Sequence, residues 1–198
     1  AFEVAHAIGL EGIQVNLGSL ANNLHLRSTE MQQAYIRASK QHKVKISSLA
    51  IGELNQVPYK SDPRTDQWVS DSIDVAEALN VKTILLAFFV KNDLRNDVPG
   101  RQEVIRKLKV VAPKAERAGV TLGIESYLTA EEHMDIIQQV VGIEPHGHHA
   151  PVQLAAAVRP VAIAEQLDLA GAAVIVQMIG DHREIGRASC RERVSCCV

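Results

Sequence analysis

A single carboxylate follows an apolar run in the sequence, and its chemical role is the first question to decide. Residues 120–124, Val-Thr-Leu-Gly-Ile, are followed directly by Glu125. A glutamate there can bind a hard divalent cation such as Mg²⁺ or Mn²⁺, act as a general base, or be the first solvated residue of a loop. Because one carboxylate does not hold a catalytic ion, the answer depends on what converges around Glu125.

Polar and aromatic residues elsewhere offer weaker candidates. Asn55, in the stretch GELNQVPY, lies in a predicted loop marked by Pro58 and Pro63, where binding residues often occur. We interpret it as a candidate substrate-binding residue, with a turn-forming asparagine as the alternative. Trp68 begins the apolar stripe of a helix and is expected in the core. His133 falls in the first turn of another helix and is expected to be exposed.

Two clusters near the C-terminus have the wrong spacing for a built metal site. The histidines lack the H-x-x-x-H spacing that puts two rings on one helix face, and the cysteines contain no C-x-x-C pair. These clusters are His146, His148 and His149, and Cys190, Cys196 and Cys197. Because residues 1–189 contain no cysteine, a disulfide framework is not expected, and the cytoplasm is the predicted location.

The composition is that of one globular domain. The chain has 198 residues, 46% of them hydrophobic and 22% charged, with a net charge of -2. This charge gives no basic footprint for nucleic acid, and no apolar run approaches the roughly 20 residues that cross a membrane. The opening AFEVAHAIGLEG has no Met and no signal-peptide pattern, and reads like the middle of a helix. We therefore expect the true N-terminus to be missing.

The elements that position Glu125 alternate between two periods. Runs typical of strands recur about 30 to 40 residues apart, with helical patterns between them. The predicted strands are 12–17, 44–51, 81–89 and 120–125, and the predicted helices are 28–42, 66–79, 101–117 and 129–140, with a later strand at 173–179. This predicts an α/β fold with a parallel sheet. Without a G-x-G-x-x-G or P-loop pattern, a (β/α) barrel is favoured over a doubly wound sheet, which stays the alternative.

Several stretches together resemble the xylose isomerase-like TIM-barrel family of sugar-phosphate isomerases and epimerases. They are SSLAIGELNQVP, DSIDVAEALNVKTILLAFF, VIRKLKVVAPKAERAGVTLGIES and AEEHMDII, all within residues 1–140. The resemblance implies a partial (β/α)8 TIM barrel of about four to five βα units. It also implies a divalent metal, Mn²⁺ or Mg²⁺, held by Glu, Asp, His and Glu at the ends of the fifth to eighth strands. Glu125 matches the first of these ligands, and Glu131 matches a glutamate that touches substrate in ketose 3-epimerases.

The chain departs from the family pattern after residue 140. The stretch GIEPHGHHA replaces a strand ending in Asp, Ile179 stands where the family has a metal-binding His, and the eighth strand is absent. The stretch EIGRASCRERV resembles translated sequencing-adapter DNA. We therefore expect a lost first strand, a disturbed continuation over 141–183, and a non-native, disordered or irregular tail over 184–198. Because the Asp, the His and the second Glu of the family pattern are missing, we expect this chain not to bind the divalent metal stably.

Three functions follow as hypotheses. The first is a fragment of a metal-dependent sugar or sugar-phosphate isomerase or epimerase that moves a proton between neighbouring carbons through an enediolate, inactive as this chain alone. The second is a non-catalytic incomplete barrel that binds a small ligand or self-associates through open sheet edges. The third is a metal-dependent abasic-site endonuclease. It is disfavoured because such enzymes usually need several histidines at strand ends, whereas the second and third predicted strands end in Ala50-Ile51-Gly52 and Phe88-Phe89. No nucleic-acid or membrane partner is expected.

Overall fold

The strands form a single parallel sheet, and the helices cover one side of it. The computed structural model describes residues 1–142 and 176–178. The strands are β1 (Gly12–Asn16), β2 (Lys45–Ile51), β3 (Thr83–Phe88), β4 (Thr121–Ser126) and β5 (Val176–Met178). The helices are α1 (Phe2–Ala7), α2 (Thr29–His42), α3 (Arg64–Leu79), α4 (Val98–Ala118) and α5 (Ala130–Val141).

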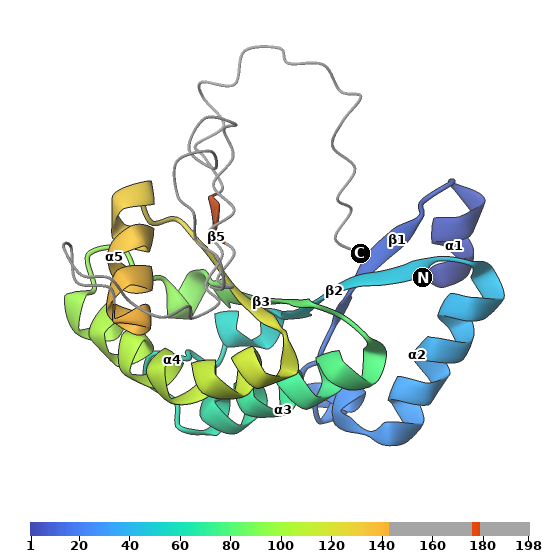
Figure 1. The fold of residues 1–198 in the computed structure, drawn as a ribbon, viewed down its shortest axis with the longest axis horizontal. Coiled ribbons are helices and arrows are strands. Elements are labelled where there is room, and N and C mark those ends of the chain that lie inside the picture. The colour runs from blue at the N-terminus through green and yellow to red at the C-terminus, as the bar shows by residue number, and fades with distance from the viewer. Residues whose placement is uncertain (143–175, 179–198) are drawn as a thin grey trace, which may run out of the picture.

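The strand order decides between the two predicted architectures. The strands lie in the order β1-β2-β3-β4-β5, and each neighbouring pair is parallel. Figure 1 shows α2, α3 and α4 following one another along the same face of the sheet. A doubly wound sheet reverses its strand order and places helices on both faces. The sequential order with helices on one face is that of a partial barrel, as the sequence predicted.

Alternation along the strands separates two faces of the sheet. Side chains that face the helices form the buried core, with Leu49 on β2, Leu86 on β3 and Ile124 on β4 as examples. Successive strand residues point to opposite faces, so the residues between these face away from the helices. We call this second face the inner face. Ala50, Leu85, Ala87, Gly123 and Glu125 occupy it.

The helix ends follow local sequence signals. The Ser28 side chain accepts a hydrogen bond from the Met31 N–H at 3.2 Å at the start of α2. Gly119 ends α4 with φ of 61°, the left-handed conformation that glycine adopts at low cost. Thr129 and Glu132 form a capping box at the start of α5. Each of these helix ends lies within about one residue of the predicted one.

The predicted start of α4 was wrong. Helix α4 begins at Val98, three residues before the predicted start, because Asp97 caps it by accepting the Gly100 N–H at 2.9 Å. Proline in the first turn loses no helical hydrogen bond, since N–H groups there have no partner within the helix. The Pro99-Gly100 pair, which reads as a loop in sequence, therefore lies inside the helix.

Some predictions fall where the structure gives no description. The histidine and cysteine clusters, the disturbed continuation beyond Gly142 apart from β5, and the predicted tail over 184–198 lie outside the described residues. Strand β5 lies within the predicted strand 173–179. Over the described ranges, none of the helices has the length and apolar character to cross a membrane.

Candidate functional site

Glu125 lies on the inner face at the carboxyl end of β4. Its register partners are Ala87 on β3 and Gln177 on β5. The side chain is half-buried, and burial raises the pKa of its carboxyl group. Within the described residues no charged or hydrogen-bonding neighbour contributes to this shift. The carboxylate is therefore a partly desolvated negative charge without a counterion in the described part of the chain.

Two aromatic rings follow the strand ends beside Glu125. Phe89 comes directly after β3 and Tyr127 directly after β4, and their ring centroids are 4.7 Å apart in an edge-to-face arrangement. Tyr127 is 46% exposed, and the Arg95 guanidinium lies 4.5 Å from its ring centroid. Because residues two apart in a strand share a face, a signal for these rings was present in the sequence, two residues beyond Ala87 and Glu125.

Asn55 is tied to this aromatic pair. Its Oδ1 atom accepts a hydrogen bond from the Phe89 N–H at 2.9 Å, which joins the short 3-10 helix Gly52–Asn55 after β2 to the end of β3. The residue thus lies at the carboxyl edge of the sheet, and its side-chain oxygen already has a partner. Its amide nitrogen is the group left to contact a ligand.

Glu131 is exposed in the first turn of α5, a few residues after Glu125. A hydrogen bond from its own backbone N–H, followed by one from the Thr129 side chain, lowers the pKa of its carboxyl group. Glu131 therefore interacts with the start of its own helix. The structure places it at the same edge of the sheet as Glu125 and Asn55.

A comparison with protein families identifies the family to which this fold belongs. The model of the xylose isomerase-like TIM barrel family matches residues 2–150. The chain belongs to the xylose isomerase-like TIM barrel family. No functionally curated protein matches it by sequence.

Solved structures share the fold at low sequence identity. A xylose isomerase domain protein from Planctomyces limnophilus has a TM-score of 0.59 and 17% identity, over 71% of this chain and 54% of that one. D-psicose 3-epimerase from Clostridium cellulolyticum H10, solved with D-tagatose, has a TM-score of 0.56 and 18% identity over 70% and 53%.

A third similar structure was solved with a metal. It is a xylose isomerase-like TIM barrel protein from Mycobacterium smegmatis in complex with magnesium, with a TM-score of 0.55 and 15% identity, over 70% of this chain and 51% of that one. This chain therefore spans about half the length of each of these three structures.

The described part of this barrel chain does not form a complete metal site. Over residues 1–142 and 176–178 there is no group of three or more His, Cys, Asp or Glu side chains placed to hold an ion. Glu125 has the oxygen chemistry, the partial burial and the lack of a competing partner that suit a hard cation. The described residues thus supply one fitting ligand and not a binding set.

The prediction for His133 was wrong. Its side chain is fully buried, at 0% exposure, although it lies in the first turn of α5. Both ring nitrogens form hydrogen bonds. Nε2 lies 2.9 Å from Ser126 Oγ, and Nδ1 lies 2.8 Å from the Thr129 carbonyl oxygen. The helix periodicity alone does not show this, because the partner is a serine at the end of β4. Trp68, by contrast, is buried in the core as predicted.

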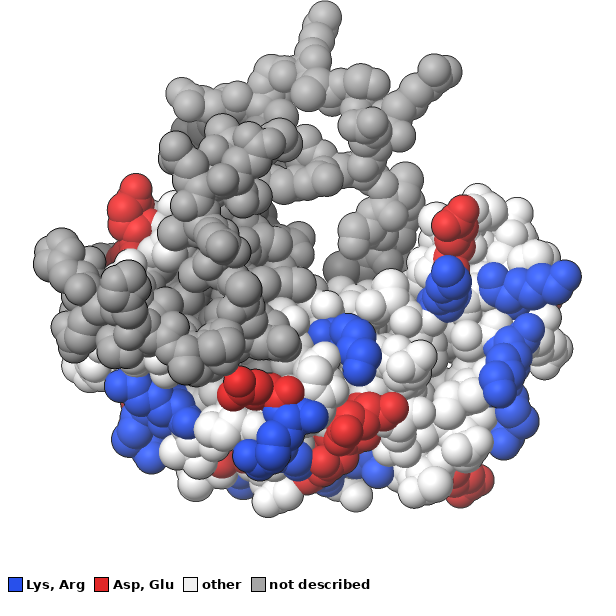
Figure 2. Space-filling view, viewed as in Figure 1, with Lys and Arg blue, Asp and Glu red and all other residues white. Residues whose placement is uncertain are grey.

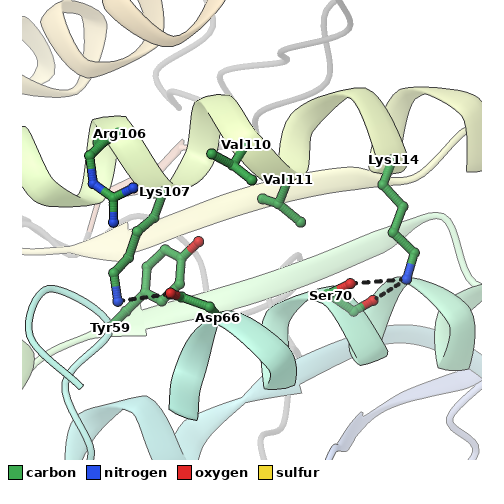
Figure 3. A pocket seen from close by; sticks show the side chains of 8 residues that line it. All are labelled: Tyr59, Asp66, Ser70, Arg106, Lys107, Val110, Val111 and Lys114. Atoms are coloured by element: carbon green, nitrogen blue, oxygen red, sulfur yellow. Dashed lines mark hydrogen bonds and ion pairs between the residues drawn. The ribbon is translucent and has the colours of Figure 1, made fainter. Parts of the chain in front are cut away.

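A hollow lies on the helical side of the barrel sheet, between α3 and α4 (Figure 3). Its cationic side chains already have carboxylate partners: Lys107 pairs with Asp66 at 2.7 Å and Lys114 pairs with Asp74 at 2.8 Å. Barrel active sites lie at the carboxyl ends of the strands, and this hollow lies between two covering helices. We assign it a structural role.

The visible surface carries both signs of charge. Figure 2 shows lysine and arginine side chains interspersed with aspartate and glutamate over the helical side. Ion pairs near the surface of the described residues include Arg106 with Glu103 and Arg64 with Asp62. The signs alternate over α3 and α4, whereas lysine and arginine side chains predominate at the right edge of the view, over α2.

Proposed function

We propose that this chain carries part of the active site of a divalent-metal-dependent sugar or sugar-phosphate isomerase or epimerase, in which Glu125 is one metal ligand. The observation that carries the proposal is the position of Glu125, on the inner face at the carboxyl end of β4, partly desolvated and unpaired among the described residues. In barrel enzymes the functional side chains converge at that end of the strands.

The substrate class rests on the similar proteins. One solved neighbour is a D-psicose 3-epimerase with D-tagatose, another is the same type of enzyme in the presence of D-fructose, and a third is a magnesium complex. At 15 to 18% identity these structures support the fold, and the sugar and the metal are our extension to this chain.

The described side chains have distinct proposed roles. A divalent cation, when bound, polarises the carbonyl and hydroxyl oxygens of an open-chain sugar, so that a proton can move between neighbouring carbons through an enediolate. Glu125 would hold the ion. The Asn55 amide nitrogen would donate to a sugar hydroxyl, and the ionised Glu131 would accept from one. The remaining ligands would have to come from outside the described residues.

Titration with Mn²⁺ tests the proposal. If residues outside the described ranges supply the missing ligands, isothermal titration calorimetry on the full chain should detect binding in the micromolar range, weakened at least about tenfold in Glu125→Gln. The matched control is Glu77→Gln, an exposed glutamate on α3. Equal affinity in the wild type and Glu125→Gln would refute the role of Glu125, and a lack of Mn²⁺ binding by the wild type would refute a metal site in this chain.

The alternative is a non-catalytic incomplete barrel. It is favoured by the single metal ligand among the described residues and by the position of β1 at the edge of the described sheet. An edge strand presents unpaired N–H and C=O groups that another chain can pair with. Sedimentation equilibrium distinguishes the cases, because this alternative predicts concentration-dependent association and no response to Mn²⁺.

A further inference from the structure

A chain of hydrogen bonds holds the junction between β4 and α5, next to Glu125. Ser126, the last residue of β4, is 1% exposed, and His133 is 0% exposed. Ser126 Oγ accepts the Leu128 N–H at 3.1 Å and lies 2.9 Å from His133 Nε2. His133 Nδ1 lies 2.8 Å from the carbonyl oxygen of Thr129. One buried imidazole therefore contacts residues 126 and 129 directly, and residue 128 is linked to it through the Ser126 hydroxyl.

The direction of each bond follows from the donors and acceptors present. A carbonyl oxygen only accepts, so the proton of the neutral His133 ring must be on Nδ1. Nε2 is then an acceptor, and the hydroxyl proton of Ser126 donates to it. Ser126 Oγ keeps a lone pair for the Leu128 N–H. The chain runs from Leu128 through Ser126 and His133 to Thr129 with every buried polar atom satisfied.

The same junction is fixed from a second side. The capping box joins Thr129 to Glu132, with the Thr129 N–H 2.9 Å from Glu132 Oε2. The Arg101 guanidinium on α4 forms an ion pair with Glu132. The first turn of α5 thus has little freedom to move relative to β4 and α4. Through the Ser126–His133 hydrogen bond, the end of β4 is held in place relative to α5.

We propose that His133 is a positioning residue for Glu125, acting through Ser126. Among the described residues no hydrogen-bonding or charged neighbour acts on the Glu125 carboxylate, so its place depends on the backbone of β4. That backbone ends at Ser126, whose side chain His133 fixes. The functional importance of this link rests on the proposed metal role of Glu125, but the link itself can be tested without a metal.

Two substitutions of His133 remove its two side-chain contacts one at a time. The amide of Asn reaches about as far as Nδ1, and the amide of Gln reaches about as far as Nε2. His133→Asn therefore keeps the contact with Thr129 and loses the contact with Ser126, whereas His133→Gln does the reverse. Glutamine should preserve the position of Glu125, and asparagine should not. Ser126→Ala should have the same effect as His133→Asn, and combining the two should add little.

Nuclear magnetic resonance tests the link in the absence of metal. The ¹⁵N shifts of His133 should show a neutral ring protonated at Nδ1. The Glu125 carboxyl ¹³C signal should shift or broaden in His133→Asn and Ser126→Ala and stay near the wild-type position in His133→Gln. An unchanged Glu125 signal in all folded variants, or an Nε2-protonated ring, would overturn the proposal.

Mn²⁺ affinity then tests the consequence for function. We expect His133→Asn to weaken Mn²⁺ binding about tenfold while His133→Gln stays within about threefold of the wild type, in the range known for residues that orient metal ligands. Equal loss in both variants, following only their loss of stability, would overturn the positioning role. If the wild type binds no Mn²⁺, the proposed function fails and the metal-free signal of Glu125 still decides whether His133 positions it.

Discussion

Ala87 lies directly opposite Glu125 in the parallel register of β3 and β4. A methyl group beside the carboxylate provides neither a counterion nor a hydrogen-bond donor, so burial acts on the charge without compensation and raises its pKa. The site thus holds a carboxylate in a position that is unfavourable for the fold alone. Such a mismatch is expected where a residue serves binding and not stability.

Replacing Glu125 by glutamine should therefore stabilise the protein at neutral pH. The raised pKa means that the folded state binds a proton more readily than the unfolded state, so the cost of the charge is absent at low pH and develops as pH rises through the folded pKa. Because the side chain is only partly buried, the gain in the free energy of unfolding should be under about 1 kcal/mol. Urea unfolding at pH 7.5 and pH 4 measures it.

The opposite result would change the interpretation of the site. A Glu125→Gln variant that is less stable than the wild type at pH 7.5 would mean that the carboxylate has a favourable partner in the folded chain. Glu77→Gln on the exposed surface of α3 serves as the control for the loss of one negative charge.

The strands and helices that position Glu125 were predictable because each carries its own local signal. The nearly continuous apolar run over 81–89 indicated a strand buried on both faces, and Thr83–Phe88 is such a strand. The glutamate at the end of 120–125 was predicted at a strand end, and it lies there. Period, caps and turn residues are properties of a few neighbouring residues, so a sequence displays them directly.

The surroundings of Glu125 were less predictable because they depend on contacts across the fold. His133 was expected in solvent, but it is buried and its ring is hydrogen-bonded to Ser126 on another element, a contact that helix periodicity does not show. The edge-to-face contact of Phe89 with Tyr127 depends on the register of two strands. The roles of Asn55 and Glu131 in substrate binding stay predictions.

The buried imidazole should make stability depend on pH. Burial lowers the pKa of His133, and it outweighs the Thr129 hydrogen bond and the nearby Glu132 charge, which act in the opposite direction. With a depressed folded pKa, the unfolded state binds the proton first as the pH falls. The buried neutral ring therefore contributes fully to the free energy of unfolding above the unfolded-state pKa of about 6.5, and this contribution is lost as the pH falls below that value.

Urea midpoints between pH 5 and pH 8 measure this dependence. The wild-type midpoint should fall on acidification below about pH 6.5, and the fall should be smaller in His133→Gln, which has no proton to gain. His6→Gln on the exposed face of α1 is the control. Parallel pH profiles for the wild type and His133→Gln would contradict the prediction.

The ion pair between Lys107 and Asp66 should contribute more to the free energy of unfolding than the pair between Lys114 and Asp74, which joins the same two helices. Lys107 is 6% exposed, its Nζ atom lies 2.7 Å from Asp66 and 5.1 Å from the Tyr59 ring centroid (Figure 3). Asp66→Asn leaves this buried ammonium without its carboxylate and should cost about 1 to 3 kcal/mol of unfolding free energy.

The pair between Lys114 and Asp74 provides the comparison. The side chains of Lys114 and Asp74 are 32% and 61% exposed, against 5% and 49% for Lys107 and Asp66, so the lysine is the partner whose burial differs most. Asp74→Asn should therefore cost under about 1 kcal/mol. Lys107→Met, which removes the buried charge together with its need for a partner, should cost less than Asp66→Asn. Equal losses for Asp66→Asn and Asp74→Asn in chemical denaturation would show that burial does not strengthen the first pair.

Alanine at Gly100 should destabilise the protein although alanine favours helices by about 1 kcal/mol over glycine. A Cβ atom on Gly100 would lie 2.3 Å from Asp97 Oδ2, far inside contact distance. Asp97 caps α4 through the Gly100 N–H and also pairs with Lys60 at 2.8 Å. Displacing it removes a cap worth about 1 kcal/mol together with this partly buried ion pair, worth up to about 1 kcal/mol. After the helix preference of alanine is subtracted, the net loss should be up to about 1 kcal/mol.

A double-mutant cycle isolates this steric cause. In an Asp97→Ala background the obstructing carboxylate is gone, so Gly100→Ala should become neutral or stabilising and recover the helix preference of alanine. The sign of the Gly100→Ala effect in urea unfolding should thus depend on the residue at position 97. A loss of the same size in both backgrounds would place the obstacle in the packing of α4 and not in its cap, because only the cap differs between the two backgrounds.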